Sequence, residues 1–192
     1  RDLGVNWQEM TPEQAQEAEP GLRLSIARAV HFPDARHIRD PEALVGRFHA
    51  AFLAQGGAHL SQRVLSVAQQ GERVVISTDA DAVTARRAVV AAGAFSGRIT
   101  GSGAENLPLG TERGYHLMFP AEAARVTRPV GGGEGGFYAV PMARGLRLAG
   151  TVEIAGLDAP ANAGRLAYLK RRGQEMLGPL PDPDSSWLGF RP

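Results

Sequence analysis

Short turn signals between strand-like runs are the feature that most limits the folds open to this chain. Three such runs span residues 58–68, 73–78 and 83–92, and they are separated by Gln70-Gly71 and by Asp79-Ala80-Asp81. A connection this short joins antiparallel neighbours, because parallel strands need a crossover of about a dozen residues or more. The sequence therefore predicts a three-stranded antiparallel meander.

A second group of strand-like runs spans 115–119, 137–142 and 146–154, and a turn containing Gly145 joins the last two. A helix is predicted over 161–177, with an apolar stripe formed by Leu166, Leu169, Met176 and Leu177. Strands outnumber helices and neighbours are joined by short turns, which favours antiparallel pairing over repeated βαβ units. The predicted fold class is α+β, with a mixed, largely antiparallel sheet and flanking helices.

Two helices are predicted before the first strands. Thr11-Pro12-Glu13-Gln14 combines an N-cap threonine, a proline at the first helical position and the glutamine of a capping box, and this helix ends before Pro20. Asp40-Pro41 repeats the N-terminal signal, and Gly56-Gly57 ends the second helix. The apolar residues of the second helix fall at helical spacing: Leu44, Val45, Phe48, Phe52 and Leu53.

Length and composition bound the organisation of the chain. It has 192 residues, of which 43% are hydrophobic, enough to bury a core in one large domain or two small ones. Along the chain we expect the meander over about 58–97 and a second sheet and helix over 108–192.

Charge and cysteine content limit the classes of binding partner and the chemistry open to this chain. The chain has 21 basic and 20 acidic residues, interspersed, for a net charge of +1, which argues against nucleic acid or anionic membrane as a main partner. Cysteine is absent, which excludes disulfides and thiolate chemistry and is compatible with a reducing cytoplasm, the expected location. The apolar runs are far shorter than the roughly 20 residues of a membrane helix, so no transmembrane segment is expected.

One glycine pattern resembles a phosphate-binding motif by spacing alone. Gly131, Gly133 and Gly136 satisfy G-x-G-x-x-G. They precede a strand-like run, whereas the dinucleotide-binding fingerprint follows a strand and opens a helix. We interpret 131–136 as a flexible loop.

Metal and nucleophile sites are not predicted. His31, Asp34 and His37 are three residues apart, but Pro33 lies between them and argues against a single helical face. A serine, histidine and acid triad can be assembled from many residues, and for that reason it carries no weight.

Five runs, in this order, resemble the glycine oxidase and D-amino-acid dehydrogenase branch of the FAD-dependent D-amino-acid oxidase family: AVVAAGAFS (88–96), TERGYH (111–116), GFYAVP (136–141), GLRLAGTVE (145–153) and WLGFRP (187–192). The resemblance extends from about Glu19 to Pro192. It implies that residues 1–192 are a substrate-binding domain fragment, with some cofactor-facing strands, from the interior of a flavoenzyme and without the N-terminal dinucleotide-binding motif. Phe95, where the family commonly has tryptophan, and Met142, where glycine oxidases often have arginine, depart from the pattern.

The resemblance implies two sets of binding residues. The residues expected to contact FAD are Val64, through its backbone at the adenine, and Ala92, Gly93, Ala94, Ser96, Thr151, Arg36 and His37. Those expected to contact substrate are Tyr138, Arg191, Tyr115 and His116, with Arg191 and Tyr138 holding a carboxylate. From the residues alone, packing in the core remains an alternative for Tyr138, and a structural ion pair remains one for Arg191.

The implied function is oxidation of the C–N bond of a D-amino acid or related amine by hydride transfer to FAD. The implied partners are that small molecule and the remainder of the polypeptide, including its dinucleotide-binding domain. No acid or base side chain is required if the amine binds neutral, so no catalytic residue is assigned, and the chain alone is expected to hold FAD weakly and to be inactive. The alternative is a non-catalytic α+β module that binds a small carboxylate.

Overall fold

The computed structural model describes residues 4–133 and 135–192. The chain divides into two compact units, each formed by segments distant in sequence. Unit 1 consists of Arg1–Val45, Tyr115–Thr151 and Ala161–Leu188, and unit 2 consists of Gly46–Gly114, Val152–Pro160 and Gly189–Pro192. The predicted meander segment, 58–97, lies wholly in unit 2, whereas 108–192 is divided between the units.

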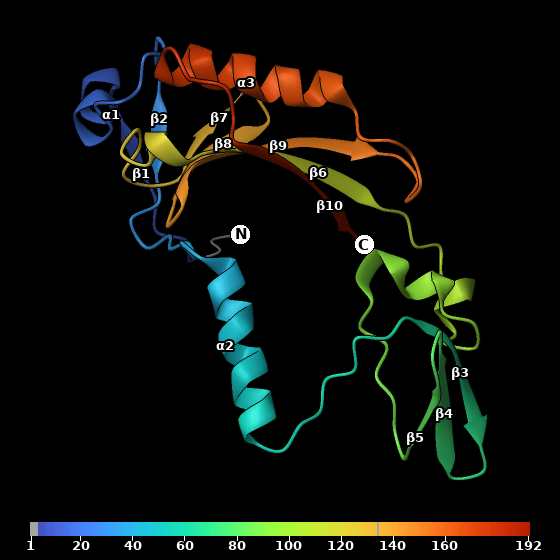
Figure 1. Cartoon of the computed structure of the whole chain (residues 1–192). Helices are drawn as coiled ribbons and strands as arrows, with labels where there is room; N and C mark the ends of the chain where they lie inside the picture. Colours follow the sequence, from blue (N-terminus) through green and yellow to red (C-terminus); the bar gives the residue numbers. More distant parts are fainter. Residues whose placement is uncertain (1–3, 134) are drawn as a thin grey trace. The chain divides into compact units, whose positions relative to one another are not determined.

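A five-stranded sheet is the largest β-structure (Figure 1). Its order is β10-β6-β9-β8-β7, and the antiparallel pairs β7–β8 and β8–β9 follow the predicted short turns. The strands are β6 (Glu112–Phe119), β7 (Val130–Gly132), β8 (Phe137–Met142), β9 (Gly145–Ile154) and β10 (Ser185–Arg191). With the helices below, this confirms the α+β class.

The core of unit 1 lies between this sheet and α3 (Ala163–Leu177), which crosses the sheet in Figure 1. Side chains alternate along a strand, so every second residue points to the helix. The sheet contributes Tyr115, Leu117, Phe119, Phe137, Ala139, Leu146 and Leu148, and α3 contributes Leu169, Met176 and Leu177. The predicted apolar stripe of this helix is confirmed, with Leu166 partly buried against the core.

Glycine brings α3 close to the sheet. A Cβ at Gly173 would lie 2.1 Å from Cδ1 of Leu148, so no larger residue fits without movement of that side chain. Leu148 is fully buried, and the contact fixes the helix over β9. Asn162 caps the helix, since its Oδ1 accepts a hydrogen bond from the Gly164 N–H at 3.0 Å.

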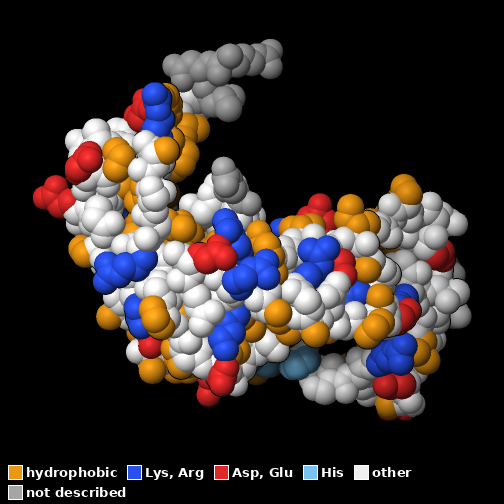
Figure 2. All heavy atoms as spheres, turned by 90° about the horizontal axis from the view of Figure 1, so that it is seen from above, with side chains coloured by type: hydrophobic (Ala, Val, Ile, Leu, Met, Phe, Trp, Pro, Cys, Tyr) orange, Lys and Arg blue, Asp and Glu red, His pale blue; other side chains and the backbone are white. Residues whose placement is uncertain are grey.

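The charged side chains of α3 lie on its solvent side. Ion pairs join Arg171 and Arg172 to Glu175, and Lys170 to Asp182. On the face drawn in Figure 2, Lys and Arg side chains are interspersed with Asp and Glu side chains. The ion pairs of Lys170, Arg171 and Arg172 weaken the field of these three cations.

The N-terminal helices begin where the sequence predicts. The helix α1 (Pro12–Ala18) has the complete capping box, with Thr11 and Gln14 bonded to each other's backbone N–H. The helix α2 (Pro41–Ala54) begins after Asp40, whose Oδ1 accepts from the Ala43 N–H at 2.9 Å. A small antiparallel sheet of β1 (Gln8–Met10) and β2 (Ala29–His31), which was not predicted, lies in unit 1.

The helix α2 is unlike the others because it buries none of its residues. Its apolar stripe is exposed, with Val45 67% and Phe48 69% accessible. Large apolar side chains gathered on one side of a helix are typical of a surface that another element covers.

The meander of unit 2 is confirmed, with the order β3 (Val64–Gln70), β4 (Arg73–Thr78) and β5 (Ala82–Ala85). Its outer strands are shorter than predicted. The reason is the length of the middle strand, because Val64 pairs with the last residue of β4 and Ala85 pairs near its first. Residues 86–92 are therefore not a strand, and the chain continues into the 3-10 helix η1 (Gly93–Arg98). Two further 3-10 turns are η2 (Ala104–Asn106) and η3 (Pro120–Glu122).

The glycine-rich run is partly a strand, which corrects the prediction of a flexible loop. Gly131 and Gly132 belong to β7, and Gly131 pairs with Tyr138 of β8. A Cβ at Gly131 would lie 2.7 Å from Cε1 of Tyr138, so the aromatic ring occupies the space that a side chain would need. Pairing and packing, which depend on distant residues, explain these glycines without any phosphate.

Candidate functional site

The sheet of unit 1 has a second face, opposite α3, and polar side chains gather there. We call this the open face and define it by Tyr138 of β8, Arg147 of β9, His116 of β6 and Trp187 of β10. Alternation places these residues there, because Tyr138, Arg147 and His116 each lie between two residues of the core cluster, and Trp187 precedes Leu188, which packs against that cluster. None of the four is buried.

Tyr138 is the most accessible large side chain of β8, with 60% of its surface exposed. Its ring lies against Gly131, while its neighbours Phe137 and Ala139 enter the core. The alternative interpretation, that Tyr138 packs in the core, is therefore wrong. Among the described residues, none makes a hydrogen bond to the phenol oxygen, which is available to a ligand.

His116 and Trp187 stack on the open face. Their ring centroids are 5.1 Å apart and their planes differ by 23°. Burial lowers the pKa of the His116 imidazole below its ordinary value, and the positive charge of Arg147 lowers it further. The imidazole is therefore neutral at neutral pH, and Arg147 is the cation beside it.

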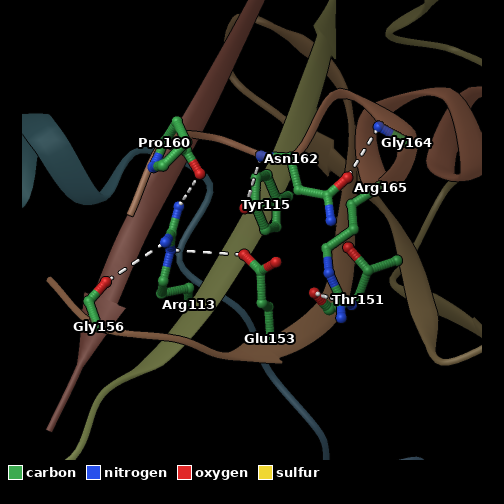
Figure 3. A network of polar contacts seen from close by, with 9 residues as sticks. All are labelled: Arg113, Tyr115, Thr151, Glu153, Gly156, Pro160, Asn162, Gly164 and Arg165. Atoms are coloured by element: carbon green, nitrogen blue, oxygen red, sulfur yellow. Dashed lines mark hydrogen bonds and ion pairs between the residues drawn. The ribbon is translucent and has the colours of Figure 1, made fainter. Parts of the chain in front are cut away.

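Tyr115 lies on the core face, opposite its neighbour His116. It is 2% exposed, and its hydroxyl accepts a hydrogen bond from the backbone N–H of Asn162 at 3.0 Å (Figure 3). Since Asn162 also caps α3, Tyr115 ties the N-terminus of this helix to β6. Tyr115 and His116 were both expected to contact substrate, and of these two only His116 faces a surface that a ligand can reach.

Thr151 has a strained backbone. Its φ is 59°, and among the described residues it is the one non-glycine residue with a positive φ. Its N–H donates to the Gly136 carbonyl at 3.1 Å, and its own carbonyl accepts from Nη1 of Arg165 at 3.2 Å (Figure 3). Its Oγ1 is buried without a hydrogen-bond partner among the described residues. Such a conformation costs about 1–3 kcal/mol and is found most often at functional sites.

Arg113 forms a buried polar cluster in unit 2. Its guanidinium is 0% exposed and lies 3.5 Å from Oε2 of Glu153. It also donates to the carbonyls of Gly156 at 3.3 Å and Pro160 at 2.8 Å (Figure 3). No role was predicted for Arg113 or Glu153, although both residues lie in the runs that carry the resemblance. Several acceptors around one buried cation indicate a structural role.

The residues expected to contact FAD lie in both units, and they are described separately. In unit 2, Val64 begins β3, and Ala92, Gly93, Ala94 and Ser96 lie at or in η1. Gly93 has a φ of 54°, and a Cβ there would meet no atom within 4 Å. A glycine in the left-handed region with open space beside it fits the close approach of a flat group to the backbone.

In unit 1, His37 lies beside the strand that carries Tyr138. Its Nε2 is 2.9 Å from the carbonyl oxygen of Pro141 in β8. Arg36 is exposed and donates to the nearby carbonyls of Pro33 and Ala35. The backbone around His37 is thus fixed to the sheet, and the side chain of Arg36 is not.

Arg191 ends β10 in unit 2 and is exposed. A Cβ at Gly114 would lie 3.3 Å from its Nη2, so the guanidinium lies over a residue without a side chain. Arg191 forms no ion pair with any of the described residues. The structural ion pair considered as its alternative is therefore absent from the described part of the chain.

The described residues also bear on metal binding and on membrane insertion. That part of the chain contains no group of three or more His, Cys, Asp or Glu residues arranged to hold a metal ion. In the same residues, no helix has both the length and the apolar character needed to span a bilayer.

Known proteins with similar sequences are amino acid oxidases and dehydrogenases. A D-amino-acid oxidase of Bradyrhizobium diazoefficiens is 33% identical over 198 residues, covering 100% of this chain and 47% of that protein. A glycine oxidase of Pseudomonas aeruginosa is 29% identical over 191 residues, covering 96% of this chain and 51% of that protein. The chain thus spans about half the length of these relatives.

Solved structures share the fold. Glycine oxidase from Geobacillus kaustophilus superposes with a TM-score of 0.77 at 23% identity, covering 100% of this chain and 52% of that one. L-proline dehydrogenase from P. horikoshii superposes with a TM-score of 0.76 at 18% identity, covering 98% of this chain and 53% of that one. The family model described as "FAD dependent oxidoreductase" matches residues 1–192, and the chain belongs to this D-amino-acid oxidase family.

Proposed function

We propose that the complete protein uses FAD to oxidise the C–N bond of a D-amino acid or related amine, and that this chain carries its substrate-facing sheet. The observation that carries the proposal is Tyr138, whose phenol is exposed on the open face and has no hydrogen-bond partner among the described residues. The names of the relatives, a D-amino-acid oxidase and glycine oxidases, support the substrate class.

In this proposal, which here follows the family resemblance, Tyr138 and Arg191 are the residues assigned to the substrate carboxylate. A guanidinium matches a carboxylate through two parallel hydrogen bonds, and a phenol adds a third donor while its ring forms an apolar wall. Gly131 sets the depth of that wall, because the ring lies where its side chain would be. Holding the carboxylate orients the α-carbon, which is the main contribution that these residues make to the rate.

The residues that would hold FAD are the backbone of Val64, the 92–96 segment, Thr151 and the segment around His37. Positive φ at Gly93 and Thr151 supports this, since each lets the backbone approach a flat group closely. FAD supplies the acceptor for the hydride that leaves the substrate α-carbon as the C–N single bond becomes C=N. The neutral His116 does not compete for the carboxylate with a charge of its own, and the released imine hydrolyses in water.

We also propose that the remainder of the polypeptide covers α2. The helix buries no residue, and its exposed Phe48 and Val45 form an apolar stripe that a packed element would bury. The matched relatives are about twice as long as this chain, which is consistent with a further domain.

Residues 1–192 by themselves are proposed to bind FAD weakly and to be inactive. Their one G-x-G-x-x-G pattern leads into a strand, so it does not offer the helix N-terminus that a pyrophosphate requires. Stoichiometric FAD in the purified 192-residue chain would contradict this part of the proposal.

The test is the visible absorption spectrum of the protein expressed from its complete reading frame. It is recorded before and after anaerobic addition of D-amino acids, glycine, sarcosine and D-proline. We expect a flavin spectrum that one or more of these compounds bleaches. A colourless protein that still binds a small carboxylate would replace the oxidoreductase with a non-catalytic binding module.

A further inference from the structure

Two phenylalanine side chains of unit 2 are in contact, and the proposed chemistry gives a role to neither. Phe95 lies in η1, between Ala94 and Ser96, and Phe190 precedes Arg191 at the end of β10. Their ring centroids are 5.4 Å apart and their planes differ by 69°, an edge-to-face arrangement. Such a pair is attractive beyond the apolar area that it buries, because the edge of an aromatic ring is positive and its face is negative.

An arginine of unit 2 lies over each of these two rings. The Cζ of Arg98 is 5.6 Å from the ring centroid of Phe95. The Cζ of Arg113 is 5.9 Å from the ring centroid of Phe190. Both distances are within the roughly 6 Å at which a cation is attracted to an aromatic face. Each phenylalanine ring therefore has a second contact that limits its motion.

Both arginines are held by the segment between β9 and α3. Arg113 donates to the carbonyls of Gly156 and Pro160 (Figure 3). Nη2 of Arg98 donates to Oδ2 of Asp158 at 2.6 Å. The hydrogen bond and the charge of Arg98 lower the pKa of Asp158, so this carboxylate is ionised at neutral pH. The contacts form a closed circuit, which we call the Phe95–Phe190 network: Phe95, Phe190, Arg98, Arg113 and residues 156–160.

The network holds the strand end from which Arg191 extends. Successive residues of a strand point to opposite faces, so Phe190, held on one face, directs Arg191 to the other. The adjacent strand β6 follows the same pattern. There Arg113 lies over the ring of Phe190, and Gly114 lies beside the guanidinium of Arg191. Since none of the described residues forms an ion pair with Arg191, the guanidinium takes its direction from the strand that carries it.

We propose that Phe95 and Phe190 are positioning residues for Arg191, and that Phe95 sets the affinity for the substrate carboxylate through its contact with Phe190. The inference rests on the proposed function and goes beyond it, because neither phenylalanine is assigned a contact with the carboxylate. Two parallel hydrogen bonds between a guanidinium and a carboxylate require a defined direction of approach. A looser strand end therefore weakens carboxylate binding although every donor is still present.

The experiment measures the affinity for acetate by calorimetry in the complete protein with excess FAD, a quantity that does not depend on turnover. Phe95→Leu removes the aromatic ring and keeps an apolar side chain, and Phe95→Trp restores an aromatic ring. Phe190→Leu breaks the same contact from the other side. Phe52→Leu is the matched control in unit 2, because Phe52 is 50% exposed, compared with 40% for Phe95, and its ring lies against Gly57. A thermal melt of each variant checks that it is folded.

We expect Phe95→Leu and Phe190→Leu each to weaken acetate binding about 3- to 10-fold, the range for loss of an aromatic pair. Phe95→Trp should keep most of the affinity, and Phe52→Leu should match the wild type within about twofold. Phe95→Leu is also combined with Arg191→Met, which removes the guanidinium. In that background Phe95→Leu should cause no further loss, because both changes act through one group.

Unchanged acetate affinity in Phe95→Leu, or an equal loss in Phe52→Leu, would overturn the proposal. A further loss in the Arg191→Met background would also overturn it, since Phe95 would then act without Arg191. Full acetate affinity in Arg191→Met alone would overturn both this inference and the role of Arg191 in the proposed function. Absence of flavin bleaching by every substrate would defeat the proposed oxidation alone, and the acetate titration would still decide the role of Phe95.

Discussion

The two faces of the β6–β9–β8 sheet differ in how their polar groups are satisfied. On the core face, the hydroxyl of Tyr115 bonds the Asn162 backbone at 3.0 Å and the surrounding side chains are apolar. On the open face, Tyr138 and Arg147 offer donors that no described residue accepts. The same strands supply both faces, with residues that pack in the core alternating with residues that we propose bind a ligand. What distinguishes the open face is that its polar side chains are not buried and include groups without a described partner.

Leu148→Ala should have the largest effect, a loss of stability, because it removes packing from the core face. Leu148 is fully buried and touches the helix at Gly173, so its truncation leaves a cavity that the close helix contact cannot fill. We expect the free energy of unfolding to fall by about 2–5 kcal/mol. Chemical denaturation followed by circular dichroism measures it, and a loss below about 1 kcal/mol would show that this face is not tightly packed.

Tyr138→Phe tests the open face with a change of one oxygen atom. Because the phenol is 60% exposed and bonds no described residue, stability should change by less than about 0.5 kcal/mol. Loss of a hydrogen bond to the substrate carboxylate should raise KM about tenfold. Steady-state kinetics and a thermal melt of the complete protein separate the two quantities. A destabilised variant with an unchanged KM would show that Tyr138 contributes to folding and not to binding, contrary to the contrast drawn between the two faces.

Thr151→Gly addresses strain at the end of β9. Glycine adopts a φ of 59° without steric cost, so the strain is relieved, partly offset by the greater freedom of glycine in the unfolded chain. We expect a net gain of about 1 kcal/mol in stability. Thr151→Ser keeps the hydroxyl and the strain and should not show the gain. FAD affinity, measured by fluorescence titration, should fall in the glycine variant if the strained backbone supports the flavin.

The smallest effect is expected in the titration of His116. Arg147→Leu removes the second cause of its lowered pKa and leaves burial, so the pKa should rise part of the way to its ordinary value. The pKa of His116 is lower in the folded protein than in the unfolded chain, and between these two pKa values the unfolded chain binds more protons. Stability therefore rises with pH over this interval. The variant should make the interval narrower, because its folded-state pKa is higher. NMR titration of the imidazole carbon resonances gives the pKa of His116 in the wild type and in the variant. An unchanged pKa would place the charge of Arg147 too far away to matter.

Local chemistry made the helices predictable, and pairing with distant residues made some strands hard to find. The capping box at Thr11 and the signal at Asp40-Pro41 act within one turn of chain, and both helices begin there. The strand ending at Ala85 stops because β4 offers no further partner, which its own residues do not reveal. The strand β7 was missed because Gly131 and Gly132 have no strand propensity and pair only through β8.

The candidate site was predicted in part for a similar reason. Tyr138 was identified from its resemblance to a family motif, and its exposure agrees with an accessible role. Arg147 was not singled out, although its alternation with Leu146 and Leu148 already predicts a charge pointing away from a buried face. The sequence does not show which residues surround that charge in the folded protein. The register of β8 and β9 shows that Tyr138 is a diagonal neighbour of Arg147.

The contact between Gly131 and Tyr138 has a consequence for how substrate range can change during evolution. Because the ring occupies the place of a Cβ on the neighbouring strand, a single methyl group at position 131 would push the phenol outward. Under the proposed function, such a change would alter the space beside Tyr138 while leaving every residue proposed to touch substrate intact. Position 131 would then tune substrate range from the neighbouring strand, by one nucleotide change from glycine to alanine.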